Sequence, residues 1–250
     1  MLTAVTRTHP GKVRTNNEDF ALVDDALSAL ALADGMGGHH AGEVASHLAI
    51  ETLRAFLQES AAGGDAQWPF ATDPALPRST NRLRVAVALA NRQVFRTSEE
   101  RPECSGMGTT LTAALVEGAR LTFANVGDSR LYLYRDGALE QITRDDSLMG
   151  SLSDVVDAET LARHPMRHVL TTVVGRAAEI PIAVGARALG DGDVLLLSSD
   201  GVHGAVPHAA LQGLLQAEPD LDRAADLVVR TALEADGRDN ITVVLARYTA

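Results

Sequence analysis

The stretch ALALADGMGGHHAGE, from Ala29 to Glu43, joins an apolar run to a glycine-rich loop and then to a helical pattern. The apolar run is typical of a buried strand. It ends in a carboxylate, Asp34, and three of the next four residues are glycines, although a surface turn needs only one or two. The stretch therefore predicts a strand, a tight loop and a helix. It leaves open whether Asp34 closes the strand or holds a ligand.

Short apolar runs predict strands at several other places in the chain. Together with the first, the predicted strands are Phe20–Val23, Leu27–Ala33, Thr109–Val116, Leu121–Val126, Leu131–Tyr134, Val194–Ser198 and Ile241–Arg247. Helical spacing of apolar residues predicts helices at Gly42–Leu57, at Leu83–Val94 after a Ser79-Thr80 capping pair, at Pro207–Ala217 and at Leu221–Ala235. Because strands cluster at both ends and in the middle, with helices in pairs between them, we expect two packed sheets covered by helices.

The chain has 250 residues, enough for one large domain or two small ones. Residues 61–77, rich in Gly, Pro and Ala, are predicted to form a surface loop, and residues 145–176 an excursion over the surface. No repeat, low-complexity tract or linker divides the sequence. We therefore expect a single domain over 1–250.

The overall charge and the cysteine content limit the partners and the compartment. The formal net charge is −11 without a basic cluster, which disfavours nucleic acid and anionic membranes as partners. Cys104 is the only cysteine, so a reducing compartment is expected, with Cys104 as a small packing residue. The N-terminus lacks a signal-peptide core, and no run approaches the ~18 apolar residues of a membrane span. These observations predict a cytoplasmic protein.

Acidic residues flank at least five of the predicted strands, nearly always beside Gly or Asn. They are Glu18, Asp19, Asp34, Asp128, Asp200 and Asp239. Any one of them is explained equally well by a turn. As a set, however, carboxylates at one sheet edge would repel one another unless a cation neutralised them, and an oxygen-only ligand set favours Mg²⁺ or Mn²⁺ over zinc.

Two neighbouring residues fit such a site. Gly35 allows the backbone to present its carbonyl oxygen as a further ligand. Arg14 carries forked donors suited to a phosphate, or alternatively an ion pair with Glu18 or Asp19.

Seven short motifs, in order along nearly the whole chain, resemble the metal-dependent type 2C serine/threonine protein phosphatases in their compact bacterial form. They are VRTNNED, ADGMGGHHAGEVAS, GMGTT, NVGDSR, ITRDDS, LSSDGV and GRDNITVV. The resemblance implies an α+β fold, a four-layer α-β-β-α sandwich with a two-metal centre at one edge of the paired sheets. It implies that Asp34 bridges two Mn²⁺ or Mg²⁺ ions, that the Gly35 carbonyl binds one of them, and that Asp200 and Asp239 complete the other.

The resemblance assigns further roles around these two ions. Glu18 would face the second ion directly or through water, supported by Asp19, and Asp128 would bind a third metal together with Asp200. Arg14 would bind the phosphate while a water activated by the two ions attacks phosphorus in line. The implied partners are phosphorylated protein substrates and a bacterial Ser/Thr kinase whose action the chain would oppose. We expect a monomer.

The sequence also departs from the family pattern. Met36 stands where many eukaryotic members carry a histidine proposed as proton donor, so the general acid is unassigned. His39 and His40 are alternatives, although a solvent-facing or helix-entry role is favoured for both. Residues 145–178 occupy the position of the family's variable flap. Four basic residues there, Arg163, His164, Arg167 and His168, are expected either to meet substrates or to form an ordinary solvated face.

Other functions remain in competition with protein dephosphorylation. A cysteine phosphatase is excluded because Thr110, not arginine, follows Cys104 by six residues, and no nucleotide-binding P-loop is present. A catalytically silent module that binds phosphoproteins would be expected to lack a metal-binding aspartate, whereas Asp34, Asp200 and Asp239 are all present. A phosphatase acting on a small metabolite ester would share the chemistry and differ in substrate.

Overall fold

The computed structural model describes residues 1–38, 40–61, 68–148, 150, 166 and 169–250. Within these residues the strands form two sheets, and all the paired neighbours are antiparallel. The first sheet has the order β1-β11-β10-β7-β8, with β1 Leu2–His9, β11 Ile241–Tyr248, β10 Val194–Ser198, β7 Arg130–Arg135 and β8 Ala138–Gln141. The second has the order β2-β3-β5-β6-β9, with β2 Asp19–Asp24, β3 Ala29–Met36, β5 Leu111–Glu117, β6 Arg120–Val126, β9 Ala183–Ala188, and β4 Gly108–Thr109 paired to β3.

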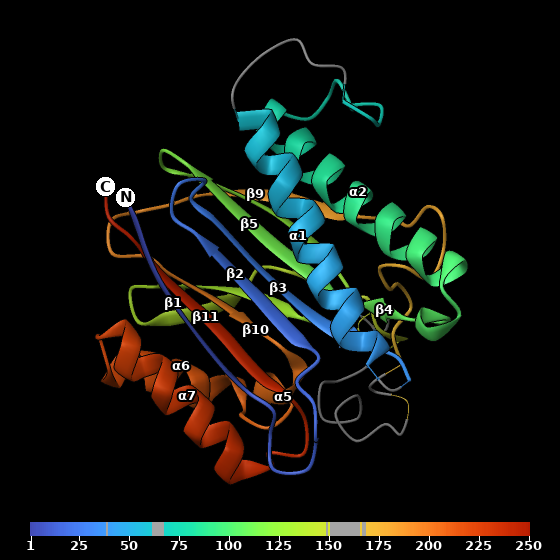
Figure 1. Cartoon of the computed structure of the whole chain (residues 1–250). Coiled ribbons are helices and arrows are strands. Elements are labelled where there is room, and N and C mark those ends of the chain that lie inside the picture. Colours follow the sequence, from blue (N-terminus) through green and yellow to red (C-terminus); the bar gives the residue numbers. More distant parts are fainter. Residues whose placement is uncertain (39, 62–67, 149, 151–165, 167–168) are drawn as a thin grey trace.

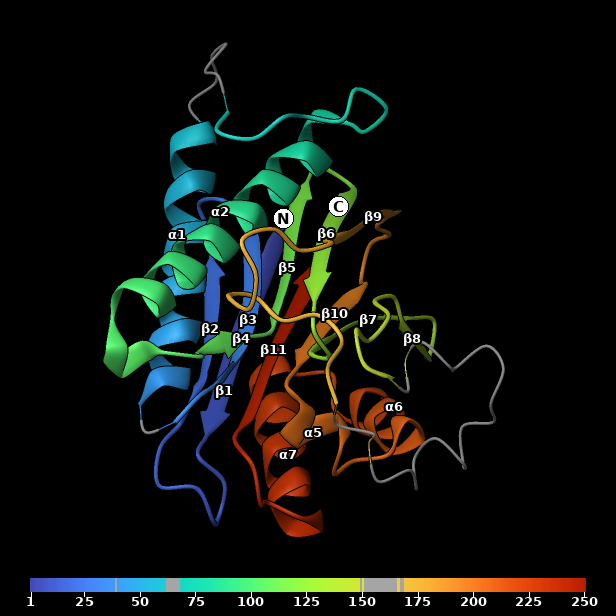
Figure 2. The same ribbon diagram turned by 90° about the vertical axis from the view of Figure 1, so that its right-hand side faces the viewer.

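Helices cover the outer face of each sheet (Figures 1 and 2). The second sheet is covered by α1 (Ala41–Ala61) and α2 (Arg78–Glu100), which is followed by a single 3₁₀ turn, Pro102–Cys104. The first sheet is covered by α7 (Leu221–Ala235), with α6 (His208–Ala217) and the short α5 (Asp200–His203) beside it. The expected four-layer α-β-β-α sandwich of the α+β class is therefore confirmed.

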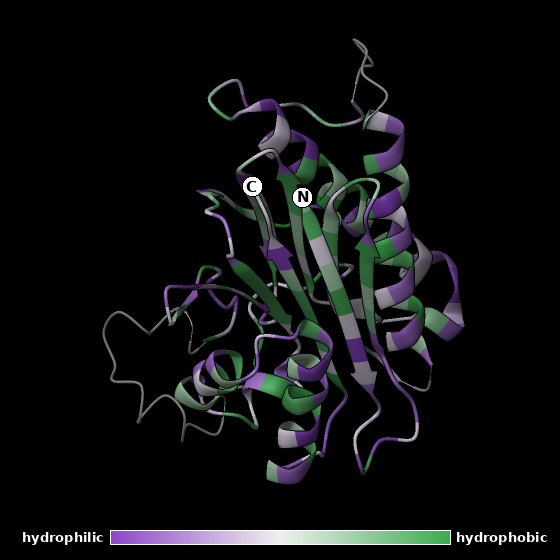
Figure 3. Cartoon of the chain, turned by 90° about the vertical axis from the view of Figure 1, so that its left-hand side faces the viewer, coloured by the Kyte–Doolittle hydropathy of each residue, from purple (hydrophilic) through white to green (hydrophobic). Residues whose placement is uncertain are grey.

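The alternation of small and large residues in β3 explains the layers. Side chains of a strand alternate between its two faces. The alanines Ala29, Ala31 and Ala33 face the core beneath α1 and α2, whereas Leu30 and Leu32 face the core between the two sheets. The small alanines let the helices approach closely, and the leucines fill the space between the sheets. Figure 3 shows hydrophobic colour along much of the strands, and hydrophilic colour mixed with it on the helices.

All the strands and helices predicted from the sequence are present, and the structure adds several elements. The additional ones are β1, β4, β8, β9, α5 and the 3₁₀ turn, and the predicted strand Thr109–Val116 is divided at Thr110 between β4 and β5. One detail was wrong: α2 begins at Arg78 with Pro77 as its N-cap, so Ser79 and Thr80 lie inside the helix and do not cap it.

Two predicted surface segments are described only in part. In the loop 61–77, Trp68 and Phe70 pack against the core beneath the helices. Of the excursion 145–176, residues 149, 151–165 and 167–168 lie outside the described residues, whereas its two ends pair with each other and with β4 through Ser147–Leu170 and Thr109–Val174 bridges.

Among the described residues, none of the helices has the length and apolar character that crossing a bilayer requires.

Candidate metal centre

The strand ends that carry acidic residues meet at one edge of the sandwich. In the second sheet, β2 begins at Asp19, which is the direct cross-strand partner of Asp34 in β3. In the first sheet, Asp200 lies just after β10 and Asp239 just before β11, and the facing ends of these two strands pair through Ser198 and Val243. The topology therefore collects carboxylates that are far apart in the sequence.

Hydrogen bonds join the two sheets at this edge. The Asn240 side-chain oxygen accepts the Glu18 N–H at 2.8 Å, and its amide nitrogen donates to the carbonyl oxygens of Pro10 and Asn16 at 3.0 and 2.9 Å. The Asn240 side chain thus fixes the loop before β2 onto the start of β11. No role was predicted for Asn240 from the sequence, although its place directly after Asp239 in GRDN was a usable signal.

The backbone of Asp34 is held by two threonines. The Thr110 hydroxyl accepts the Asp34 N–H at 2.9 Å, and the Thr110 N–H and the Thr109 hydroxyl each donate to the Asp34 carbonyl at 2.9 Å. Thr110 also bonds to the Ser129 hydroxyl, at 2.8 Å between the oxygens. The GMGTT motif therefore fixes the backbone of the residue to which the resemblance assigned the metal-bridging role.

The raised pKa of Asp34 shows that the carboxyl groups lie close to one another. Burial raises the pKa of Asp34 well above its usual range, and the charges of Asp19, Asp200, Asp128 and Asp239 raise it further. Asp34 keeps some exposed surface, but protein atoms surround it densely. Each carboxylate that ionises makes the next harder to ionise, as expected where several share one site.

Asp19 and Asp128 show the same effect. Burial raises the pKa of each to about 7, and in both cases the charge of Asp200 adds to the rise. The hydroxyls of Thr242 and Ser199 oppose the rise at Asp19. At neutral pH these acids are therefore poised to accept a neutralising cation.

The Asp19 carboxylate provides a test of whether this site suits a cation. Asp19 is only 5% exposed, and neither of its carboxylate oxygens has a hydrogen-bond partner among the described residues. A buried carboxylate without partners is costly, and a hard divalent ion is the partner that oxygen ligands favour. The donor set therefore fits Mg²⁺ or Mn²⁺. Within the described residues no three acids already surround one point as a complete ligand set, so the individual ligands stay a prediction.

Glycines allow Glu18 to approach the β3–α1 loop and the first turn of α1. A Cβ atom on Gly42, in the first turn of α1, would lie 2.7 Å from the Glu18 carboxylate carbon. A Cβ on Gly35 would lie 2.0 Å from the Gly42 carbonyl oxygen, and the Gly35 N–H already donates to the Glu18 carbonyl at 3.0 Å. Burial raises the pKa of Glu18, and the charge of Arg14 opposes that rise. The glycine-rich stretch therefore brings the β3–α1 loop and Glu18 together.

Arg14 lies at the rim of this site. Its guanidinium donates to the Asp239 carboxylate at 2.9 Å, and its side chain remains 53% exposed. Among the described residues, Arg14 therefore forms its ion pair with Asp239. The alternative prediction of an ion pair with Glu18 or Asp19 was wrong. The half-exposed guanidinium remains accessible to a ligand.

The structure places only some of the other candidates. Met36 is the last residue of β3, and its cross-strand partner is Gly108. His40 is solvent-facing, as favoured, with a 72% exposed side chain whose Nδ1 lies 3.3 Å from the Asn16 amide nitrogen. Cys104 is buried, in keeping with a packing role. His39 and the four basic residues of the excursion, Arg163, His164, Arg167 and His168, lie outside the described residues.

Comparison with known proteins gives the family. The model of the family Protein phosphatase 2C matches residues 11–245. The chain belongs to this family. It is 40% identical over 244 residues to the serine/threonine protein phosphatase PstP of Mycobacterium tuberculosis, covering 96% of this chain but 44% of PstP, so it spans less than half of that relative. It is 33% identical to the serine/threonine phosphatase stp of Listeria welshimeri, covering 96% of this chain and 93% of stp.

A solved structure supports the likeness at the level of the fold. The crystal structure of the PstP catalytic domain in complex with two manganese ions superposes with a TM-score of 0.84 at 35% identity, covering 100% of this chain and 99% of that one.

Proposed function

We propose that this chain is a metal-dependent phosphatase that hydrolyses phosphoserine and phosphothreonine in proteins. The observation that carries the proposal is the sheet edge where burial and the charge of Asp200 raise the pKa of Asp19, Asp34 and Asp128. The buried Asp19 carboxylate there lacks a hydrogen-bond partner among the described residues. The family membership and the manganese in the PstP structure support the same chemistry.

The proposed ligands follow from this placement. Asp34 would bridge two Mn²⁺ or Mg²⁺ ions, Asp200 and Asp239 would hold one of them, and the Gly35 carbonyl oxygen would bind the other. Glu18 and Asp19 would support the pair, and Asp128 would share a third ion with Asp200. When bound, such ions supply Lewis acidity and a nucleophilic water at neutral pH.

The chain's own residues would orient the substrate. Arg14, held by Asp239 and half exposed, would bind two phosphoryl oxygens with its forked donors and offset the charge that develops during in-line displacement. Asn240 and the Thr109–Thr110 pair would keep the carboxylate-bearing segments in register. The substrate's serine or threonine oxygen would leave and take up a proton, whose donor we leave unassigned.

The biological setting is also a proposal. We propose a single catalytic domain, a monomer, acting in the cytoplasm on phosphoproteins, so that a Ser/Thr kinase must supply its substrates. The lone buried Cys104 fits a reducing compartment. Exposed groups at the rim, Arg14 and His40, fit a site open to a polypeptide substrate.

Phosphate release from a phosphothreonine peptide tests the function. We expect turnover with Mn²⁺, loss of turnover with a chelator and with Asp200→Asn, and unchanged turnover with Glu234→Gln, an exposed acid on α7. A folded wild type that binds the phosphopeptide without hydrolysing it would favour a silent regulatory module. A higher kcat/KM on small phosphate esters than on peptides would favour a metabolite phosphatase.

A further inference from the structure

The loop that carries Asp128 is held by a residue nineteen positions further along the chain. Gly127, between β6 and β7, donates its N–H to the Asp146 carboxylate at 3.1 Å, and its carbonyl accepts the Asp146 N–H at 2.8 Å. The Asn125 side chain donates to the Gly127 carbonyl as well, at 3.1 Å. The position of the Asp128 loop therefore depends on Asp146, which lies at the root of the excursion 145–178.

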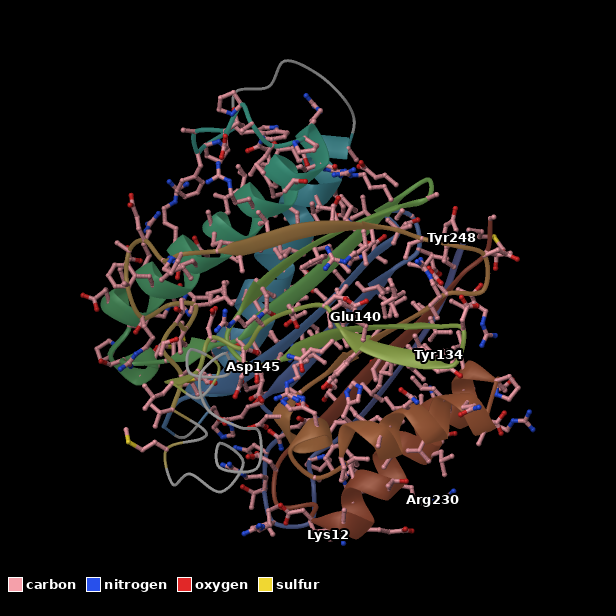
Figure 4. All side chains as sticks on the ribbon, turned by 180° about the vertical axis from the view of Figure 1, so that it is seen from behind. Lys12, Tyr134, Glu140, Asp145, Arg230 and Tyr248 are labelled. Carbon is pink, nitrogen blue, oxygen red and sulfur yellow. The ribbon has the colours of Figure 1, made fainter. Side chains whose placement is uncertain are left out.

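A second attachment lies on the other side of Asp128. Arg130 donates to both carboxylate oxygens of Asp145, through Nε at 3.0 and 3.2 Å and through Nη2 at 2.8 Å. Gln141 donates to the same carboxylate at 3.0 Å, and Arg130 also reaches the Tyr132 hydroxyl at 3.2 Å. The side chains of Arg130 and Asp145 are 27% and 15% exposed, so this bidentate pair is largely shielded from water. Figure 4 labels Asp145 where the chain has left β8.

The far end of the excursion is attached to the Asp34 side of the site. Asp146 accepts the Thr171 N–H on its carbonyl at 2.7 Å, which joins the two described ends. Val174 and Thr109 exchange two backbone hydrogen bonds at 3.0 and 2.9 Å, and the Thr109 hydroxyl donates to the Asp34 carbonyl. The root of the excursion is thus bonded to the segments of two candidate ligands, Asp128 and Asp34.

We propose that Asp145 and Asp146 are positioning residues that fix the Asp128 loop, so that a divalent cation held by Asp128 and Asp200 binds tightly only while both attachments are intact. The inference rests on the proposed function, because it concerns a cation of the same centre. Groups that orient metal ligands without touching the metal commonly contribute tenfold or more to affinity. By thermodynamic reciprocity, a cation bound at Asp128 also stabilises the root of the excursion.

Manganese titration followed by the EPR signal of the free ion tests the proposal without any assay of activity. In Asp146→Ala we expect one binding step of the wild type to weaken by about tenfold or more, while the other steps stay within about twofold. Asp146→Asn should bind like the wild type, because its amide oxygen can still accept the Gly127 N–H. Asp145→Asn, which loses the charge of the second attachment, should weaken the same binding step.

Asp193→Asn is the matched control. Arg135 and Asp193 form the same kind of bidentate pair at the opposite end of β7, so its loss should leave the titration unchanged. Circular dichroism checks that each variant is folded. If Asp146→Ala does not fold, the manganese titration of Asp145→Asn tests the proposal in its place.

Several results would overturn this proposal and leave the proposed function intact. One is a wild type that binds only two manganese ions, and another is an Asp146→Ala variant that titrates like the wild type. The proposal would also fail if Asp146→Asn or Asp193→Asn lost as much manganese affinity as Asp146→Ala. A wild type that binds no manganese would overturn the proposed function together with this inference.

Discussion

At the scale of single residues, a substitution at Gly42 is expected to affect the stability of α1 and the activity of the site differently. Alanine normally favours a helix over glycine by about 1 kcal/mol. At Gly42, however, a Cβ would lie 2.7 Å from the Glu18 carboxylate and displace it. For Gly42→Ala we expect phosphopeptide hydrolysis to fall by about tenfold or more, while the free energy of unfolding in chelator stays within about 1 kcal/mol of the wild type.

Gly213 in α6 is the control for this substitution. A Cβ there would meet no described atom within 4 Å, so Gly213→Ala should raise the free energy of unfolding without changing activity. Wild-type activity in Gly42→Ala would show that the position of Glu18 does not matter for hydrolysis.

At Asp34, a substitution is expected to stabilise the metal-free fold and to abolish hydrolysis. Replacing the carboxyl by an amide of the same shape removes a charge that burial and four neighbouring acids make costly. In chelator at pH 8 we therefore expect Asp34→Asn to have a higher thermal midpoint than the wild type. With Mn²⁺ it should gain little stability and show no hydrolysis of phosphopeptide. A lower midpoint in chelator would mean that the Asp34 charge stabilises the metal-free fold.

At the scale of elements, the strands that sequence analysis missed have weak signals for identifiable reasons. None of the residues of β1 is fully buried, and its polar residues Thr3, Thr6, Arg7 and Thr8 hide the pattern, yet it pairs along its whole length with β11. Gly185 interrupts β9, where the ring of Phe123 fills the space a side chain would need. Edge strands of this kind are determined by their neighbours rather than by their own composition.

At the site, too, the contacts between residues that are distant in the sequence could not be predicted from local sequence patterns. The carboxylates were predictable because each stands near the end of a strand, nearly always beside a Gly or Asn. Their supports, Asn240 for Glu18 and Thr110 for Asp34, act across 222 and 76 positions. No local pattern connects residues so far apart, so these contacts needed the fold.

Arg82 joins elements in the helical layer and gives a prediction of stability. Only 7% exposed, it donates to the Ser60 hydroxyl at 2.8 Å, to the Leu57 carbonyl near the end of α1, and to Glu117 of β5 at 3.2 Å. Removing it leaves the buried Leu57 carbonyl and the partly buried Ser60 hydroxyl without this donor. We expect Arg82→Ala to lower the free energy of unfolding by about 2–3 kcal/mol in urea denaturation.

Arg96→Ala on the same helix is the control. Its pair with Glu100 is exposed at both ends, and such pairs contribute less than about 0.5 kcal/mol. Equal losses in the two variants would mean that Arg82 acts only through helix propensity.

At the scale of the whole molecule, the gathered carboxylates predict how stability depends on pH. Asp19 and Asp128 titrate near 7 in the folded chain but near 4 when unfolded, so between these values the folded chain binds more protons. The free energy of unfolding of the chelated protein must then fall as pH rises through this window, by at most about 4 kcal/mol for each group.

Mn²⁺ should reverse this trend, because the ionised carboxylates are the form that binds it. Thermal unfolding between pH 5.5 and 8 would measure both effects. In chelator we expect the midpoint to fall toward pH 8, and the midpoint gained on adding Mn²⁺ to grow over the same range. Asp19→Asn should flatten the slope in chelator, since its amide does not titrate, whereas Glu234→Gln, which removes an exposed acid, should leave it unchanged. A chelated wild type whose stability rises from pH 5.5 to 8 would show that these carboxyl groups are already neutralised within the protein, and the need for a cation at this edge would disappear.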